Sequence, residues 1–139
     1  MKKGIIAGSF DLIHPGYVRM FRDSKKVCDY LIIALQGDPT IERSNKCKPV
    51  HTIKERKEIL ESIRFIDEIV TYNTESELYE LLKNIDYDVR ILGVEYKSTN
   101  YTGKDLGKAV YWLERPHMYS TTNLKEKIYK ERLESKNKL

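Results

Sequence analysis

Short strand-like segments alternate with longer amphipathic segments along this chain of 139 residues. The strand-like segments are residues 3–7, 30–36, 68–72, 89–93 and 109–113, and each has a length typical of a β-strand. Residues 30–36 (YLIIALQ) are apolar almost without a break, which indicates a strand that is buried on both faces of a parallel sheet.

Four helices are expected between and after these strands, beginning near Pro15, Thr52, Thr74 and Thr121. Proline suits the first helical position, because its missing N–H has no intrahelical partner to lose. The first helix is expected to continue to about residue 26. Thr52 and Thr74 are each followed three residues later by glutamate, which is a capping signal.

Alternation of strands and helices predicts right-handed crossovers and a parallel sheet with helices on both faces. We therefore expect a single α/β domain over residues 1–139, a Rossmann-like doubly wound sandwich with a central five-stranded parallel sheet. In such sheets, ligands bind beyond the carboxyl ends of the strands, where the strand order reverses.

Composition narrows the class of protein further. Apolar residues make up 40% of the chain and charged residues 33%, as in soluble domains, and no apolar segment reaches the length of a membrane span. We expect no membrane insertion and a cytoplasmic protein in which Cys28 and Cys47 stay reduced. The net charge of +4 suits an anionic ligand. Nucleic-acid signatures are missing, so a small-molecule substrate is favoured over nucleic acid.

The segment GSFDLIHPGY, residues 8–17, joins the first strand to the first helix. Helix N-termini attract anions, Gly8 lets a ligand approach the main chain, and Gly16 leaves room in the first turn. His14 can donate a hydrogen bond to a phosphate oxygen, although it can equally be a helix cap, and Asp11 can be only a turn former. The spacing matches neither a dinucleotide-binding fingerprint nor a P-loop.

Two further segments at the same edge of the sheet carry groups suited to phosphate. Lys46 and Lys48 stand one residue apart in a polar loop that can close on a polyphosphate, although loop lysines are commonly only solvated. Arg115 provides a permanent charge, and Ser120 and Thr121 stand at a helix start, where hydroxyls commonly serve only as caps.

These segments together resemble a known family. GSFDLIHPG resembles the Gly-x-Phe-Asp-x-x-His-x-Gly-His signature of the nucleotidyltransferase superfamily, and YSTTNLKEKI resembles its second signature. KCKPVHTIKERKEILESIRFIDEI resembles the lysine loop and following helix of the cytidylyltransferase branch. The length and the order of the motifs match the small bacterial glycerol-3-phosphate cytidylyltransferases.

The resemblance implies transfer of CMP from CTP to a small phosphorylated polyol, with glycerol 3-phosphate as the first expectation, and release of pyrophosphate. It also implies a Mg²⁺ ion that bridges the phosphates, with Asp11 as the nearby acid, and a homodimer. The implied catalytic residues are His14, Lys46 and Arg115, and the acceptor-binding residues are Asp11, Lys46 and Lys48. The implied nucleotide-binding residues are Gly8, Ser9, Phe10, His14, Gly16, Tyr17, Arg56, Arg115, Ser120 and Thr121.

The chain departs from the family signature at three positions. Tyr17 stands where the first signature has its second histidine, and tyrosine carries no positive charge near neutral pH. His117 is an additional histidine before Ser120, and Val94 occupies a position that is often acidic. Two alternatives therefore stay open: an adenylyltransferase that acts on a sugar phosphate, and a nucleotide-binding homologue with weak or no catalysis.

Overall fold

The computed structural model describes residues 1–138, which contain five parallel strands in the spatial order β3-β2-β1-β4-β5. This sheet confirms the expected Rossmann-like fold class. The bounds are β1 Lys3–Gly8, β2 Tyr30–Gln36, β3 Glu68–Tyr72, β4 Val89–Gly93 and β5 Ala109–Leu113.

The helices begin where their caps predict. They are α1 Pro15–Ser24, α2 Ile53–Glu61, α3 Glu75–Asn84 and α4 Thr121–Asn137, with single 3₁₀ turns at Pro39–Ile41, Val94–Tyr96 and Lys104–Leu106. Thr52 and Glu55 form a complete capping box, in which each side chain accepts from the other residue's amide, at 3.1 and 2.9 Å. Helix α1 ends at Ser24, two residues earlier than its apolar pattern predicted.

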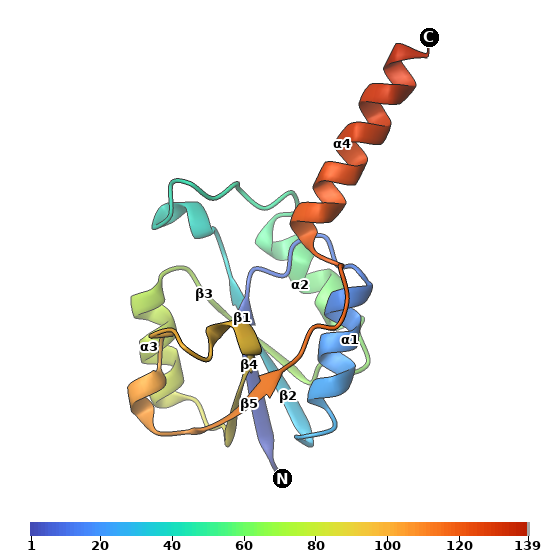
Figure 1. Cartoon of the computed structure of the whole chain (residues 1–139). Helices are drawn as coiled ribbons and strands as arrows, with labels where there is room; N and C mark the ends of the chain where they lie inside the picture. The colour runs from blue at the N-terminus through green and yellow to red at the C-terminus, as the bar shows by residue number, and fades with distance from the viewer. Residues whose placement is uncertain (139) are drawn as a thin grey trace.

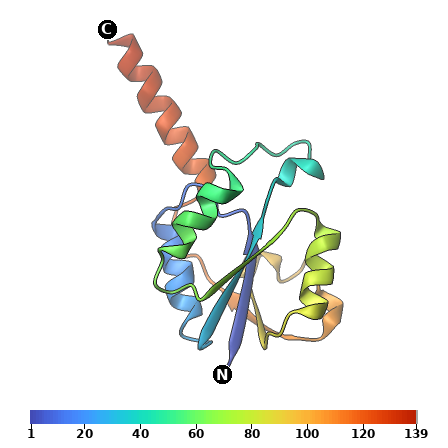
Figure 2. The ribbon, with the colours of Figure 1, turned by 180° about the vertical axis from the view of Figure 1, so that it is seen from behind.

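Helices cover both faces of the sheet (Figure 1). Phe21 of α1 and Leu60 of α2 pack against one face, and Leu78 and Leu82 of α3 pack against the other. Figure 2 shows this layering from behind, with α4 extending away from the body of the protein. No residue of α4 is buried.

Strand β1 lies between β2 and β4, so the strand order reverses beside it. The chain leaves β1 toward α1 and leaves β4 toward the opposite face, and this is the point at which doubly wound sheets bind ligands. Cys28 is buried and Cys47 is exposed. Within residues 1–138, no helix is both long and apolar enough to cross a bilayer.

Candidate active site

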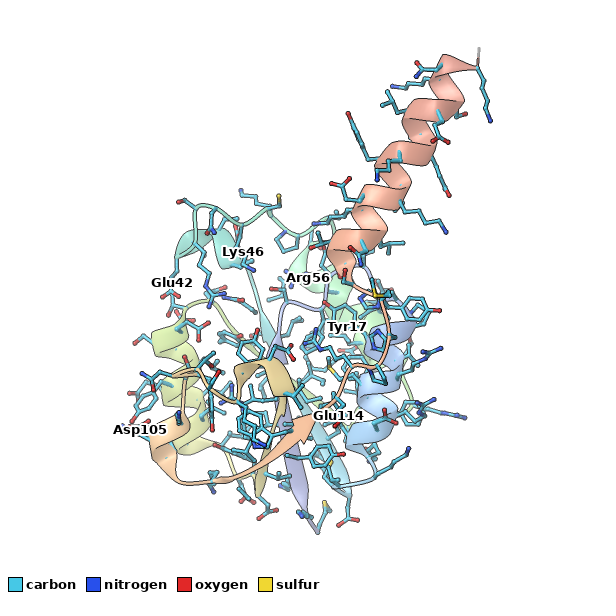
Figure 3. The ribbon with its side chains drawn as sticks, viewed as in Figure 1. Tyr17, Glu42, Lys46, Arg56, Asp105 and Glu114 are labelled. Carbon is cyan, nitrogen blue, oxygen red and sulfur yellow. The ribbon has the colours of Figure 1, made fainter. Side chains whose placement is uncertain are left out.

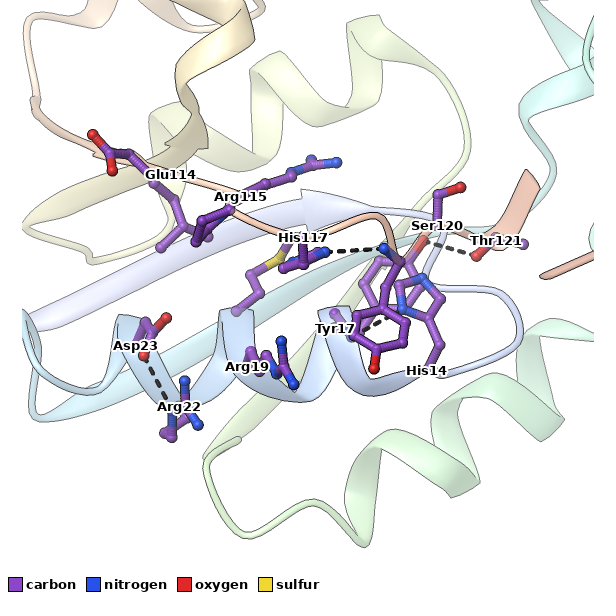
Figure 4. Close-up of a pocket in the computed structure, with 15 residues that line it drawn as sticks. His14, Tyr17, Arg19, Arg22, Asp23, Glu114, Arg115, His117, Ser120 and Thr121 are labelled. Carbon is purple, nitrogen blue, oxygen red and sulfur yellow. Dashed lines mark hydrogen bonds and ion pairs between the residues drawn. The ribbon is translucent and has the colours of Figure 1, made fainter. Parts of the chain in front are cut away.

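A cleft of about 1040 Å³ lies along the carboxyl edge of the sheet. It is lined by the β1–α1 loop (Gly8–Asp11), by part of the segment that follows β2, and by the first turns of α4. A smaller cavity of about 330 Å³ adjoins it and lies between α1 and the segment that follows β5 (Figure 4). Tyr17, Arg115 and Thr121 line both cavities, so these residues stand at the junction.

The β1–α1 loop has an unusual backbone. Phe10 and Leu12 adopt positive φ angles of 46° and 53°, a left-handed conformation that bulky side chains rarely accept. Each such residue costs on the order of 1–3 kcal/mol, so the surrounding packing must hold the loop in place. Phe10 is only 3% exposed, and its ring packs against Tyr17 and Phe21 of α1. A side chain at Gly8 would begin 3.2 Å from this ring, which explains the glycine there.

His14 caps helix α1. Its Nδ1 accepts a hydrogen bond from the Gly16 amide at 3.1 Å, so the neutral ring carries its proton on Nε2. Nε2 is buried and has no hydrogen-bond partner within residues 1–138. Burial lowers the His14 pKa, and the electrostatic effects of His117 and Arg115 lower it further. His14 therefore caps α1 through Nδ1, and in its neutral form it has an N–H donor at Nε2 that is unused within residues 1–138.

Tyr17 connects α1 to the start of α4. Its ring stacks on His14 at 4.2 Å between centroids, and its hydroxyl lies 3.3 Å from Thr121 Oγ1. Thr121 Oγ1 donates to the Asp11 carbonyl at 2.7 Å. Tyr17 therefore positions two neighbouring site residues through its ring and its hydroxyl.

The space above Gly16 is already filled. A side chain at Gly16 would begin 2.8 Å from His117, 2.9 Å from His14 and 2.9 Å from Tyr119. The room that Gly16 leaves in the first turn is occupied by His14 and by residues of the segment after β5, and a role of Gly16 in nucleotide binding stays a prediction. Gly16 allows this segment to pack against the first turn of α1.

Asp11 holds two loops together. Its carboxylate accepts from the amides of Val50 at 2.7 Å and His51 at 3.0 Å, and Lys125 Nζ lies 3.8 Å away. Both oxygens therefore serve the main chain, and no group of three or more His, Cys, Asp or Glu side chains in residues 1–138 is arranged to hold a metal ion. The role of Asp11 as an acid near magnesium stays a prediction.

Arg56 stabilises the loops at the carboxyl edge of the sheet through main-chain hydrogen bonds. It is 2% exposed, and its guanidinium donates to four main-chain carbonyls, those of Ser9, Gln36, Gly37 and His51. Arg56 is not among the residues that line either cavity. Instead of facing the nucleotide site, as the sequence analysis expected, it fastens the carboxyl ends of β1 and β2 to the start of α2.

The three basic residues that the sequence predicted for the site, Lys46, Lys48 and Arg115, differ in their position and in their ion pairing. Lys46 lines the cleft from the exposed segment after the 3₁₀ turn Pro39–Ile41, across the cleft from Tyr17 (Figure 3). Lys48 is exposed and lines neither cavity. Arg115 follows β5 by two residues and pairs with Glu95 at 3.0 Å.

The start of α4 completes the site. Ser120 Oγ accepts from the Asn123 amide at 3.0 Å and so caps α4. The other first-turn amides of a helix have no intrahelical partner, which favours binding of an anion there. Ser120 and Thr121 lie beside His14 and Tyr17 in the close-up (Figure 4). Tertiary structure therefore brings the two end motifs of the sequence together.

One residue that lines the cleft was missed by the sequence analysis. Arg90 of β4 is 5% exposed and contributes to the wall on the α3 side. Its signal was a single arginine inside the otherwise apolar segment VRILG.

The doubly wound sheet and the donors gathered at its carboxyl edge define a protein of the nucleotidyltransferase superfamily. A family model described as cytidylyltransferase-like matches residues 5–127, and the chain belongs to this family.

Curated relatives of similar length support this assignment. The chain is 34% identical over 128 residues to the glycerol-3-phosphate cytidylyltransferase of Bacillus subtilis (strain 168), covering 92% of this chain and 98% of that protein. It is 31% identical over 129 residues to the Staphylococcus aureus enzyme of the same name, covering 93% and 96%. The crystal structure of a lipopolysaccharide core biosynthesis protein from Thermoplasma volcanium shares the fold, with a TM-score of 0.66, 20% identity, and coverage of 86% and 99%.

Proposed function

We propose that this protein is a CTP-dependent cytidylyltransferase that acts on a small phosphorylated polyol, with glycerol 3-phosphate as the first candidate. A phosphate oxygen of the acceptor attacks the α-phosphorus of CTP, and a new P–O bond forms. The bond from the α-phosphorus to the α,β-bridging oxygen breaks, pyrophosphate leaves with that electron pair, and a CDP-alcohol remains.

The observation that carries this proposal is the buried Nε2 of His14, which has no partner within residues 1–138 and lies beside Arg115 and the start of α4. A polarised N–H donor and a permanent cation at one point suit the charge that develops on transferring phosphates. In this proposal Arg115, Ser120 and Thr121 bind the β- and γ-phosphates.

Other parts of the cleft receive the remaining substrate groups in this proposal. Gly8, Ser9 and Phe10 line the nucleotide pocket. Lys46 and Lys48 bring positive charge to the triphosphate and to the acceptor phosphate from the exposed loop. A magnesium ion would be held chiefly through the nucleotide phosphates, as is common for this ion, because residues 1–138 contain no group of three or more His, Cys, Asp or Glu side chains arranged to hold a metal.

Pyrophosphate release tests the proposal. The protein is incubated with glycerol 3-phosphate, magnesium and each nucleoside triphosphate in turn, and release with CTP alone is the expected result. Release with ATP alone would instead identify an adenylyltransferase. Binding of CTP without turnover of any phosphorylated acceptor would identify a non-catalytic homologue. Wild-type protein without acceptor provides the background rate.

A further inference from the structure

Arg90 is a buried cation that belongs to the strand core rather than to a loop. It is the second residue of β4 and pairs in register with Ile5 of β1. Its side chain lies on the α3 face of the sheet. A Cβ atom placed on Gly103 would lie 3.1 Å from Arg90 Nη1 and 2.8 Å from Leu82 of α3, so Arg90 and α3 lie close to the same point. The sheet therefore separates Arg90 from His14, which caps a helix on the opposite face.

Among the described residues the positive charge of Arg90 has no ion-pair partner, and its guanidinium carbon lies 5.8 Å from the centre of the Tyr101 ring. None of the ion pairs between described residues includes Arg90. Glu75 lies close enough to attract the guanidinium, but its carboxylate pairs with Arg43 at 3.3 Å and accepts from the Thr102 hydroxyl at 2.7 Å. Burial lowers the Arg90 pKa, yet an arginine starts so far above neutrality that it stays charged.

The guanidinium also keeps an unused edge. Nη1 donates to the Thr102 carbonyl at 2.6 Å, whereas Nε is buried without any partner in residues 1–138. Buried charges in proteins are normally paired and fully hydrogen-bonded, because an unpaired one is costly. Arg90 lines the large cleft together with Tyr72 and Tyr101, and it is 5% exposed, so an anion in the cleft can approach its guanidinium, although not the buried Nε itself.

We propose that Arg90 binds a second anionic group of the acceptor, so that the preferred acceptor carries a carboxylate or a further phosphate besides the phosphate that reacts. This inference rests on the proposed function for the reaction and refines its acceptor. The charges of CTP lie in its triphosphate, which the proposal places at His14 and Arg115. The base and ribose of CTP are neutral, so the acceptor is the substrate that can bring another anion to the α3 side.

Acceptor competition tests this specificity. Glycerol 3-phosphate, 3-phosphoglycerate and glycerol 1,3-bisphosphate are compared as acceptors with CTP. An acceptor with a second anionic group is expected to have a kcat/KM at least about tenfold above that of glycerol 3-phosphate. Preference for the carboxylate or for the bisphosphate tells which anion the site takes. Equal or better use of glycerol 3-phosphate would overturn the proposal.

Substitution of Arg90 gives the second test. Arg90→Gln is expected to lower kcat/KM about a hundredfold for the preferred acceptor and by a much smaller factor for glycerol 3-phosphate, so that the ratio of the two values falls. Arg64→Gln is the matched control, because Arg64 is exposed and lines neither cavity. Equal losses with all acceptors would make Arg90 only a support for the loop at Thr102, and a rise in KM for CTP alone would assign it to the nucleotide.

Folding and binding measurements keep the test decisive. Thermal unfolding checks each variant, and Arg90→Lys, which keeps the charge but loses the Nε edge, replaces Arg90→Gln if the latter unfolds. Calorimetry with the same acceptors, and with a CTP analogue whose α,β-bridging oxygen is a methylene, measures binding without turnover. Anion-selective binding that is lost on Arg90 substitution supports the anion site, whether or not an acceptor reacts. If such binding is seen without any turnover, only the proposed function is rejected. Turnover without anion selectivity rejects only the role of Arg90.

Discussion

His14 and Tyr17 act as a pair. The stacked rings both line the smaller cavity, and the Tyr17 hydroxyl lies 3.3 Å from Thr121 Oγ1. Tyrosine in place of a second histidine gives up a cation, but it gains a contact from α1 to the start of α4. The side chain of Tyr17 therefore positions its neighbours, and its contact with the nucleotide stays a prediction.

Substitution of His14 separates its two roles. Asparagine is also a good helix cap, so His14→Asn is expected to fold while losing about a hundredfold in kcat through loss of the Nε2 donor. Pyrophosphate release measures kcat, and thermal unfolding measures the cap. A variant with unchanged kcat would show that His14 is a cap alone.

The same residue predicts a pH dependence of stability. Because burial holds the folded pKa of His14 below the ordinary value of 6.5, the unfolded chain takes up a proton at higher pH than the folded chain. Stability linked to neutral His14 is full above about pH 6.5 and falls as the pH drops below it. Unfolding by urea at pH 7.5 and pH 5 is expected to show a larger loss for the wild type than for His14→Asn.

At the scale of elements, the site is a junction of loops held by buried polar groups. Asp11 accepts two amides from the segment before α2, and Arg56 of α2 donates to carbonyls that end β1 and β2. Both side chains reach the backbone of other elements, so they fix the loops relative to each other. The strained φ angles of Phe10 and Leu12 are held within this framework.

Arg56→Met is expected to destabilise the fold by about 3 kcal/mol, because buried carbonyls lose their donors. Urea unfolding measures the change, with Arg64→Gln as the exposed control. Arg56→Lys tests the nucleotide role that the sequence suggested. A raised KM for CTP in that variant, with stability unchanged, would return Arg56 to the nucleotide site.

At the scale of the whole molecule, α4 begins in the site and then leaves the body of the protein (Figure 1). Its exposed side chains include the apolar Ile128 and Leu133, which are 53% and 46% exposed. A second copy of the chain is the partner that the family resemblance suggests, and we propose that α4 contributes to a homodimer.

Sedimentation equilibrium tests the dimer. The wild type is expected to sediment as a dimer, and the double variant Ile128→Lys, Leu133→Lys as a monomer, because charge at a buried contact opposes association. A matched pair, Lys127→Gln with Lys136→Gln, changes the charge of α4 without removing apolar surface. A wild type that stays monomeric at millimolar concentration would reject the dimer.

Local sequence patterns predict the strands, the helix starts and the two motifs that lie together at the site. Apolar periodicity and capping are local properties, so Thr52, Thr74 and the segment Tyr30–Gln36 could be interpreted correctly from their neighbours alone.

The hydrogen-bond partners of several polar side chains depend on the tertiary structure. Asp11 meets amides 39 and 40 residues away, Arg56 meets a carbonyl 47 residues away, and Thr121 meets the Asp11 carbonyl 110 residues away. Such partners depend on how β1, α2 and α4 pack together, which no local pattern encodes. The same packing fills the space at Gly16 and places the lone arginine of β4 against the cleft, because side-chain environment is set by neighbours in space rather than in sequence.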